Sequence, residues 1–208
     1  MGNTGRVGRP PAADSAETRR RLLHAARVRF ARDGFRSTTN RHIAADSGIT
    51  SGAIYHYVSS KAELYAAVYC DTVDEVYSEF ERVASHETTL LGQFGAVLRS
   101  ACDLQVDDPS ITGFIVAVAQ ETRRHPDLVA LLAPQRGRHA GFFTDLVQAA
   151  ADRGELAADV DRRAVADLLG AVLAGLARMS TTAGDPGRYT SAVEVLERFL
   201  AGTLLVRP

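Results

Sequence analysis

One short stretch, ITSGAIYHYVSSKAELY, places small, hydrogen-bonding and aromatic side chains next to one another. Thr50 and Ser51 supply hydroxyl groups, and Gly52 and Ala53 supply almost no side chain. A helix that enters the major groove of DNA, about 12 Å wide, needs small residues where its backbone approaches the bases. Hydroxyl groups can bond base edges or phosphates, and an alanine methyl can meet a thymine methyl. The stretch therefore has the chemistry of a groove-contacting surface.

Larger polar groups flank this stretch. Tyr55 and His56 can reach phosphate oxygens, which set the register of a protein on DNA rather than its sequence preference. Lys61 is the only lysine of the chain and falls in the first turn of a predicted helix, where its charge and the helix amides favour a phosphate. Thr38 and Thr39 stand where hydroxyl and amide groups can grip the opposite DNA backbone. A structural explanation stays open, because threonine and serine also cap helices without DNA and the tyrosines could be partly buried.

The elements that must position these groups follow from helix start and stop signals. We predict four helices: from Asp14 to a stop at Asp33-Gly34, from a Thr39 cap to a break at Gly48, from Ser51 to about Tyr57, and from a Ser60-x-x-Glu63 capping box towards Arg82. Gly48 can take the positive φ of a tight turn. Ile43, Ala44, Ile49 and Ile54 point inward in this arrangement, which has the order and spacing of a helix-turn-helix.

Charge is divided unequally along the chain, although its formal net charge is only −1. Residues 1–61 hold 11 Arg or Lys and 4 Asp or Glu, whereas residues 62–208 hold 13 and 21. A basic head on an acidic body is typical of a polyanion-binding module joined to another unit. A solvated charged face is the alternative explanation.

The stretch TTNRHIAADSGITSGAIYHYVSSKAELYAAV resembles the DNA-binding signature of the TetR family of bacterial transcription regulators nearly from end to end. The resemblance covers residues 15–70 and implies an all-α homodimer whose second domain binds a small ligand. Three positions depart from the family pattern: Asn40, Ser51 and Val58. The resemblance, together with the groove chemistry above, predicts these DNA-binding residues: Arg6, Arg9, Thr38, Thr39, Arg41, Thr50, Ser51, Gly52, Ala53, Tyr55, His56 and Lys61.

Three regions are expected: a flexible basic arm over 1–13, a DNA-binding domain over 14–60, and a helical regulatory body over 61–208. Arg6 and Arg9 in the arm could enter a minor groove, although a solubilising tail explains them equally well. The body is predicted to be helical throughout, over 87–107, 109–124, 127–153, 161–183 and 189–205. Pro134 can bend or split its segment.

The body carries an apolar inventory that suits either a plain core or a ligand cavity. The expected pocket residues are Phe94, Leu98, Cys102, Phe114, Val118, Phe142, Phe143 and Leu146, with Glu121 and Arg178 among the possible polar partners. Small and apolar residues of the last two helices could instead form a four-helix dimer interface or pack within one subunit. The expected interface residues are Leu168, Ala171, Val172, Gly175, Met179, Val193, Leu196, Phe199 and Leu200.

These features favour a cytoplasmic, ligand-responsive repressor that is released from a pseudo-palindromic operator by a small, largely apolar effector. A DNA-binding protein of the same fold that is controlled by a partner or by abundance is the main alternative, and a helical lipid carrier is another. The sequence holds no nucleophile motif, phosphate-binding glycine loop or metal-ligand spacing, so we expect no enzyme, cofactor or metal. Cys70 and Cys102 are isolated and are expected to be small apolar core residues.

Overall fold

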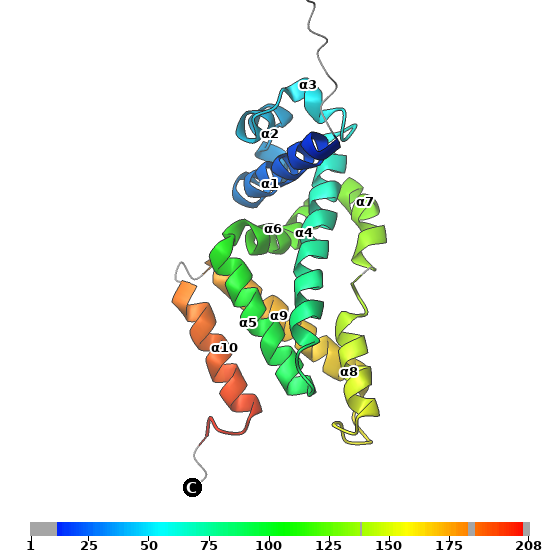
Figure 1. The fold of residues 1–208 in the computed structure, drawn as a ribbon, viewed down its shortest axis with the longest axis vertical. Coiled ribbons are helices and arrows are strands. Elements are labelled where there is room, and N and C mark those ends of the chain that lie inside the picture. The colour runs from blue at the N-terminus through cyan, green and yellow to red at the C-terminus, as the bar shows by residue number, and fades with distance from the viewer. Residues whose placement is uncertain (1–11, 138, 183–185, 206–208) are drawn as a thin grey trace, which may run out of the picture.

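The computed structural model describes residues 12–137, 139–182 and 186–205, and within these ranges every regular element is a helix (Figure 1). The predicted all-α fold is therefore confirmed. The helices are α1 (Ala12–Ser37), α2 (Asn40–Ser47), α3 (Ser51–Ile54), α4 (Lys61–Ala84), α5 (Leu90–Asp107), α6 (Pro109–Arg124), α7 (Pro126–Arg136), α8 (Phe142–Asp152), α9 (Arg162–Thr182) and α10 (Pro186–Leu200).

Three helix starts use the caps that the sequence predicts. The side-chain oxygens of Thr39, Thr50 and Ser60 each accept the backbone N–H three residues ahead, at 3.3, 3.1 and 3.1 Å. Each bond satisfies one of the amides that a helix start leaves without a partner. The capping box of α4 is displaced by one residue, because Glu63 accepts the N–H of Ser59, at 2.9 Å, rather than that of Ser60.

The ends of the first and third helices differ from the prediction. α1 begins at Ala12, so Asp14 lies inside the helix rather than at its start. Gly34 does interrupt the helix, at φ 76° and ψ 171°, but helical residues continue to Ser37. α3 ends at Ile54, and residues 55–57 continue as a turn whose N–H groups bond carbonyls three residues back, at 2.9–3.2 Å. This tighter winding is common at helix ends.

The segment predicted to be helical over 127–153 is split into two helices, as Pro134 allowed, although the break lies a few residues beyond the proline. The chain forms α7 and α8, with an irregular segment around Gly137 and Gly141 between them. Pro134, near the end of α7, has no N–H to donate to the carbonyl four residues back, which weakens the last turns of that helix. His139 in this segment bonds Asp74 of α4, with Nε2–Oδ1 at 2.8 Å.

One core cluster connects the first four helices with the body of the protein. It contains buried residues of α1 to α4, and it is completed by Phe114 and Val118 of α6 and by Leu128 and Leu132 of α7. Tyr65 lies at its centre, with ring centroids 4.9 Å from Phe30 and 5.0 Å from Phe114. The helix-turn-helix is therefore packed directly on the body.

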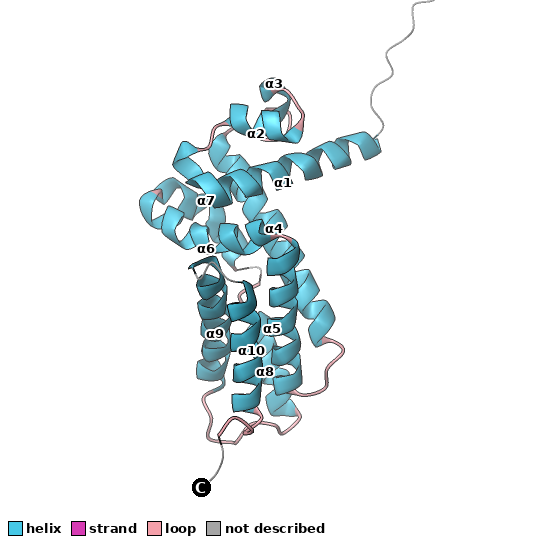
Figure 2. Ribbon diagram, turned by 90° about the vertical axis from the view of Figure 1, so that its left-hand side faces the viewer, coloured by secondary structure: helices cyan, strands magenta, loops and turns pink. Residues whose placement is uncertain are grey.

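The rest of the body packs around two further clusters, one among α5, α8, α9 and α10 and one among α4, α5, α6 and α8. Figure 2 shows α5, α8, α9 and α10 running together away from the helix-turn-helix end, with α9 and α10 side by side. α4 belongs to both ends, since it starts beside α3 and runs the length of the body (Figure 1).

Candidate nucleic-acid interface

α2 and α3 meet at a tight turn on Gly48. This residue has φ 69° and ψ 29°, the left-handed conformation that glycine adopts without a Cβ clash, and its N–H bonds the carbonyl of Ala44. Ile43 and Ile54 have no exposed surface, and Ile49 packs partly buried against the same core. The two short helices are thus held in one relative orientation, as a helix-turn-helix requires.

The outer side of this motif is open to solvent. The side chain of Tyr55 is 59% exposed, and its hydroxyl accepts a hydrogen bond from Nδ2 of Asn40 at 3.4 Å. The unusual residue at position 40 therefore ties the start of α2 to the turn after α3. Of the residues predicted to contact DNA, the exposed ones are Thr39, Arg41, Thr50, Ser51, Gly52, Tyr55 and His56, with Ala53 half-buried.

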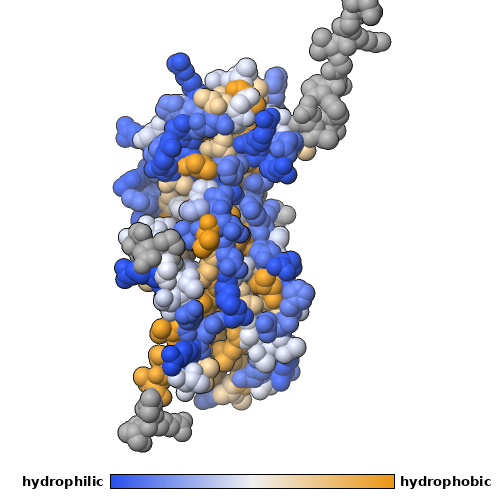
Figure 3. Space-filling view, turned by 60° about the vertical axis from the view of Figure 1, so that its left-hand side comes forward, coloured by the Kyte–Doolittle hydropathy of each residue, from blue (hydrophilic) through white to orange (hydrophobic). Residues whose placement is uncertain are grey.

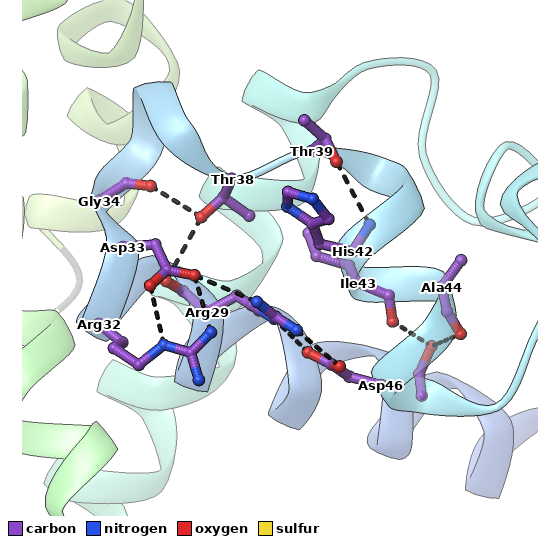
Figure 4. Close-up of polar contacts among 11 residues, drawn as sticks. Arg29, Arg32, Asp33, Gly34, Thr38, Thr39, His42, Ile43, Ala44 and Asp46 are labelled. Carbon is purple, nitrogen blue, oxygen red and sulfur yellow. Dashed lines mark hydrogen bonds and ion pairs between the residues drawn. The ribbon is translucent and has the colours of Figure 1, made fainter.

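Thr38 is placed differently from the expectation. Its side chain has no exposed surface, and its hydroxyl donates to the carbonyl of Gly34 at 2.8 Å, with the Arg29 carbonyl 3.3 Å away (Figure 4). The hydroxyl is used inside the joint between α1 and α2. It is not presented to a phosphate in this structure.

Lys61 is also turned towards this joint. Its Nζ donates to the carbonyls of Phe35 at 2.8 Å and Thr38 at 2.9 Å, and it lies 4.5 Å from the centroid of the Phe35 ring. Burial lowers the pKa of its ammonium group, while the nearby Glu121 carboxylate opposes that shift. A lysine on the last carbonyls of a helix stabilises that helix end.

Glu121 of α6 contacts the joint from the body. The sequence suggests it as a polar group of the ligand region, but its side chain is buried and its Oε1 accepts the N–H of Phe35 at 3.3 Å. Its Oε2 lies 3.4 Å from Nε2 of His125. The end of α1 is therefore held by an ammonium group from α4 and by a carboxylate from α6.

An ion-pair cluster fixes α1 against α2, and sequence reasoning missed it. Arg29 bonds both carboxylate oxygens of Asp46, with Nη2–Oδ1 at 2.9 Å, and also reaches Asp33 (Figure 4). A hydrogen bond from Arg32 lowers the pKa of Asp33 to about 2, although desolvation opposes this. No spacing in the sequence links residues 29 and 46, because they meet only when two helices cross.

The body contains a mainly apolar cavity of about 250 Å³ among α4, α5, α6, α8 and α9. Val76 and Phe80 of α4, Ile115 of α6 and Leu173 of α9 are among its lining residues. Hydroxyl groups enter the lining only with Tyr77 and Thr112. Burial raises the pKa of Tyr77, so its hydroxyl stays protonated at neutral pH.

The family described as "Bacterial regulatory proteins, tetR family" matches residues 22–68, and "BetI-type transcriptional repressor, C-terminal" matches residues 93–205. The chain belongs to the TetR family.

Individual relatives agree with this assignment. The HTH-type transcriptional regulator UidR of Escherichia coli K12 is 24% identical over 195 residues, covering 92% of this chain and 95% of the relative. The structure of GusR from Salmonella enterica is 27% identical with a TM-score of 0.66, covering 90% and 95%. FadR of Bacillus subtilis, in complex with stearoyl-CoA, is 15% identical with a TM-score of 0.72, covering 86% and 97%, which shows the shared fold.

The predicted pocket residues of this TetR-family protein are spread over different parts of the body. Phe143 lines the apolar cavity and contacts Phe94, with ring centroids 6.2 Å apart. Phe114 and Val118 instead belong to the core beneath the helix-turn-helix. The others do not line this cavity. Phe94, Leu98 and Cys102 are buried in the cluster of α5, α8, α9 and α10. Phe142 and Leu146 line a separate hollow of about 340 Å³ beside α4. Residue spacing cannot distinguish these environments, because each is apolar and helical.

The predicted interface residues lie on α9 and α10, which leave much of their apolar surface uncovered. Leu168 is 61% exposed and Phe199 is 59% exposed. Ala171, Gly175 and Leu200 are also exposed, whereas Val172, Met179 and Leu196 are half-buried and Val193 is buried. Figure 3 shows apolar residues gathered along the lower part of this side of the molecule.

Three further features are the arm arginines, groups that could hold a metal ion, and the buried cysteine. Arg6 and Arg9 lie outside the described residues. Among the described side chains, no group of three or more His, Cys, Asp or Glu is placed to hold a metal ion. Cys102 is buried, and desolvation raises the pKa of its thiol to about 11, so it remains a protonated core residue at neutral pH.

Proposed function

We propose that this TetR-family protein is a homodimeric, cytoplasmic repressor that binds a pseudo-palindromic operator and leaves it when a small, largely apolar ligand binds the body. The observation that carries the proposal is the exposed face of the helix-turn-helix, from Thr50 to His56, mounted on the buried anchors Ile43 and Ile54. That face combines small groups with phosphate-reaching ones, as a recognition helix in a major groove requires.

The predicted DNA-binding residues have different roles under this proposal. Thr50, Ser51, Gly52 and Ala53 face base edges, whereas Thr39, Arg41, Tyr55 and His56 bind phosphates, and Arg6 and Arg9 enter a minor groove. Thr38 and Lys61 act through the protein instead. Their bonds to the end of α1 stabilise the joint between α1 and α2.

Dimerisation through α9 and α10 accounts for their exposed apolar faces. By length and composition alone α9 could also cross a membrane, and only 11% of its most apolar window is buried. An interface explains the same surface for a protein whose matched relatives are DNA-binding regulators. Twofold symmetry would place two recognition helices in successive major grooves.

The apolar cavity supports the ligand-responsive part of the proposal. A cavity of about 150 Å³ is enough for benzene, so 250 Å³ suits a ligand slightly larger than one aromatic ring. The lining excludes a charged ligand, because burial of an unpaired charge there has a high desolvation cost. A ligand that widens the cavity would move α4 and α6, whose far ends hold Lys61 and Glu121 at the joint.

The test is binding of the full-length protein to DNA upstream of its own gene, measured against random competitor across a salt series. The comparison variant is Arg41→Ala with Tyr55→Ala, and the matched control is Arg163→Ala with Tyr69→Phe, which lies away from the exposed face. We expect competitor-resistant binding by the wild type and control, with loss of affinity and a shallower salt slope in the variant.

Sequence-specific recognition is contradicted if all three proteins bind the upstream DNA and the random competitor equally weakly. The same conclusion requires that a selection of genomic fragments yields no preferred sequence. If specific binding is found but no apolar compound displaces the protein, control by a partner or by abundance replaces control by a ligand. The DNA-binding part of the proposal would then stand alone.

A further inference from the structure

A third hollow, distinct from the apolar cavity and from the hollow beside α4, lies between α1, α6 and α9. It is an open groove of about 540 Å³, and none of its lining residues is shared with the apolar cavity. Its apolar lining is made of small side chains, including Ala31 of α1 and Val116 and Ala117 of α6. The two helices approach closely here, since a Cβ on Gly113 would lie only 3.6 Å from that of Ala31. The groove therefore offers an apolar floor to a narrow ligand.

The polar lining of this groove has one sign of charge. Arg32, Arg123 and Arg178, from three different helices, line it, and among the described residues no Asp or Glu does. Arg32 is bonded to Asp33, but Arg123 and Arg178 form no ion pair with any residue that the structure describes. This is unusual in residues 62–208, where acidic residues outnumber basic ones by 21 to 13. The groove thus contains positive charge that no described residue neutralises through an ion pair.

A further polar group of the groove lacks a partner. The side-chain oxygen of Gln105, at the end of α5, is buried and has no hydrogen-bond partner among the described residues. A buried polar atom without a partner has a cost of about 1–3 kcal/mol. A ligand or water that donates to this oxygen would remove that cost.

We propose that this groove binds an amphipathic organic anion, with its apolar part on the floor between α1 and α6 and its phosphate or carboxylate on Arg123 and Arg178. Guanidinium groups are suited to such heads because they bind them through paired N–H donors. The DNA backbone is a poorer match, since phosphate contacts to DNA do not require an apolar hollow. The groove also lies on the side of α1 that faces α6, whereas α2 and α3 lie on its other side (Figure 1).

Occupancy would matter for DNA binding because the groove joins two parts of the protein. Its walls come from α1, which carries the helix-turn-helix, and from α6 and α9 of the body. A ligand in contact with all three helices favours the arrangement in which they are close, and so changes operator affinity by linkage. This effect is separate from that of a neutral ligand in the apolar cavity.

The experiment is calorimetric titration of the full-length protein with octyl phosphate, octanol and inorganic phosphate, each below any micelle formation. The variant is Arg123→Ala with Arg178→Ala. The matched control, Arg124→Ala with Arg188→Ala, removes the same charge from exposed arginines of α6 and α10 that do not line the groove. Circular dichroism and thermal melting check that both double variants fold, and Arg123→Lys with Arg178→Lys retains the charge.

We expect octyl phosphate to bind at one site per chain, at least about tenfold more tightly than inorganic phosphate, a difference of about 1.4 kcal/mol. The groove variant should lose that binding by about tenfold or more, the lysine variant by less, and the control by less than about twofold. Octanol binding, which reports on the apolar cavity, should be the same in all of them.

The proposal is overturned if octanol and octyl phosphate bind alike, or if the control variant weakens binding as much as the groove variant. It is also overturned if the groove variant loses only non-specific DNA binding, which assigns the arginines to DNA. If the groove variant becomes monomeric but binds octyl phosphate as tightly as the wild type, the groove is a contact with a second copy of the chain and the proposal is overturned. None of these outcomes changes the test of operator binding.

Discussion

The carboxylate of Glu121 accepts the backbone N–H of Phe35 directly beside Gly34, with Oε1 and nitrogen 3.3 Å apart. A Cβ on Gly34 would lie 2.9 Å from the same oxygen, too close for real atoms. The glycine is therefore required by its backbone conformation, and a side chain there would also displace the Glu121 carboxylate. Lys61 bonds the Phe35 carbonyl from the other side, so one peptide segment is held by both α4 and α6.

The first prediction concerns this contact. Gly34→Ala should lower the free energy of unfolding by about 2–3 kcal/mol, because φ 76° with ψ 171° is essentially restricted to glycine and the new methyl also displaces Glu121. Gly154→Ala is the matched control, since Gly154 has the same φ of 76° but nothing within 4 Å of an added Cβ. It should lose only about 1 kcal/mol. Urea denaturation measures both, and equal losses would show that neither the ψ of 171° at Gly34 nor the Glu121 contact adds to the loss.

The second prediction distinguishes Thr38 from Thr50, both of which the sequence predicts to bind DNA. Thr38→Val should lower the free energy of unfolding by about 1–2 kcal/mol, because it removes the buried bond to Gly34, but operator affinity of the folded protein should stay within about twofold. Thr50→Val removes an exposed cap and a hydroxyl on the recognition face, so operator affinity should fall by about tenfold. Fluorescence anisotropy at low urea concentration measures the affinity of each variant for operator DNA. A large loss of affinity in the stable fraction of Thr38→Val would restore Thr38 as a DNA contact.

The helix-turn-helix could be predicted from the sequence because its signals are local. Thr39, Thr50 and Ser60 bond amides three residues away. Gly48 is favoured at its position because the turn there has a positive φ. The joint could not be predicted, because Lys61 and Glu121 reach it across 26 and 86 residues of sequence. The apolar residues of the body meet the same difficulty. Their pattern identifies helices, but not which side of a helix faces a cavity, a core or a partner.

The third prediction is a loss of stability in acid that depends on the α1–α2 ion pairs. Hydrogen bonds from Arg32 and Arg29 lower the pKa values of Asp33, to about 2 from 3.8, and of Asp46, although desolvation opposes both shifts. In acid the unfolded chain takes up these protons first, so it binds more protons than the folded state and stability falls with falling pH. The loss should develop as pH falls from about 5 to about 2.

Asp46→Asn checks this assignment by urea denaturation at several pH values. The variant should be less stable than the wild type at neutral pH, and it should lose less stability in acid because one titrating group is gone. Asp167→Asn, which removes an exposed carboxylate of α9 without an ion pair to a described residue, should follow the wild-type profile. Profiles for Asp46→Asn and wild type that stay parallel would show that this pair is not the source of the acid sensitivity.

The fourth prediction tests the exposed face of α9 and α10. Leu168→Glu with Phe199→Glu should convert the protein from dimer to monomer, because it places two carboxylates where about 1.5–3 kcal/mol per apolar side chain would be gained by burial. Leu131→Glu on α7 is the control, since Leu131 is also an exposed leucine but lies away from α10 in Figure 1. Sedimentation equilibrium gives the oligomeric state. Because a monomer can contact only one half-site, the double variant should also lose operator affinity, while circular dichroism should show that it stays helical. A double variant that remains dimeric would place the interface on another surface, and the apolar face of α9 would then need a different partner.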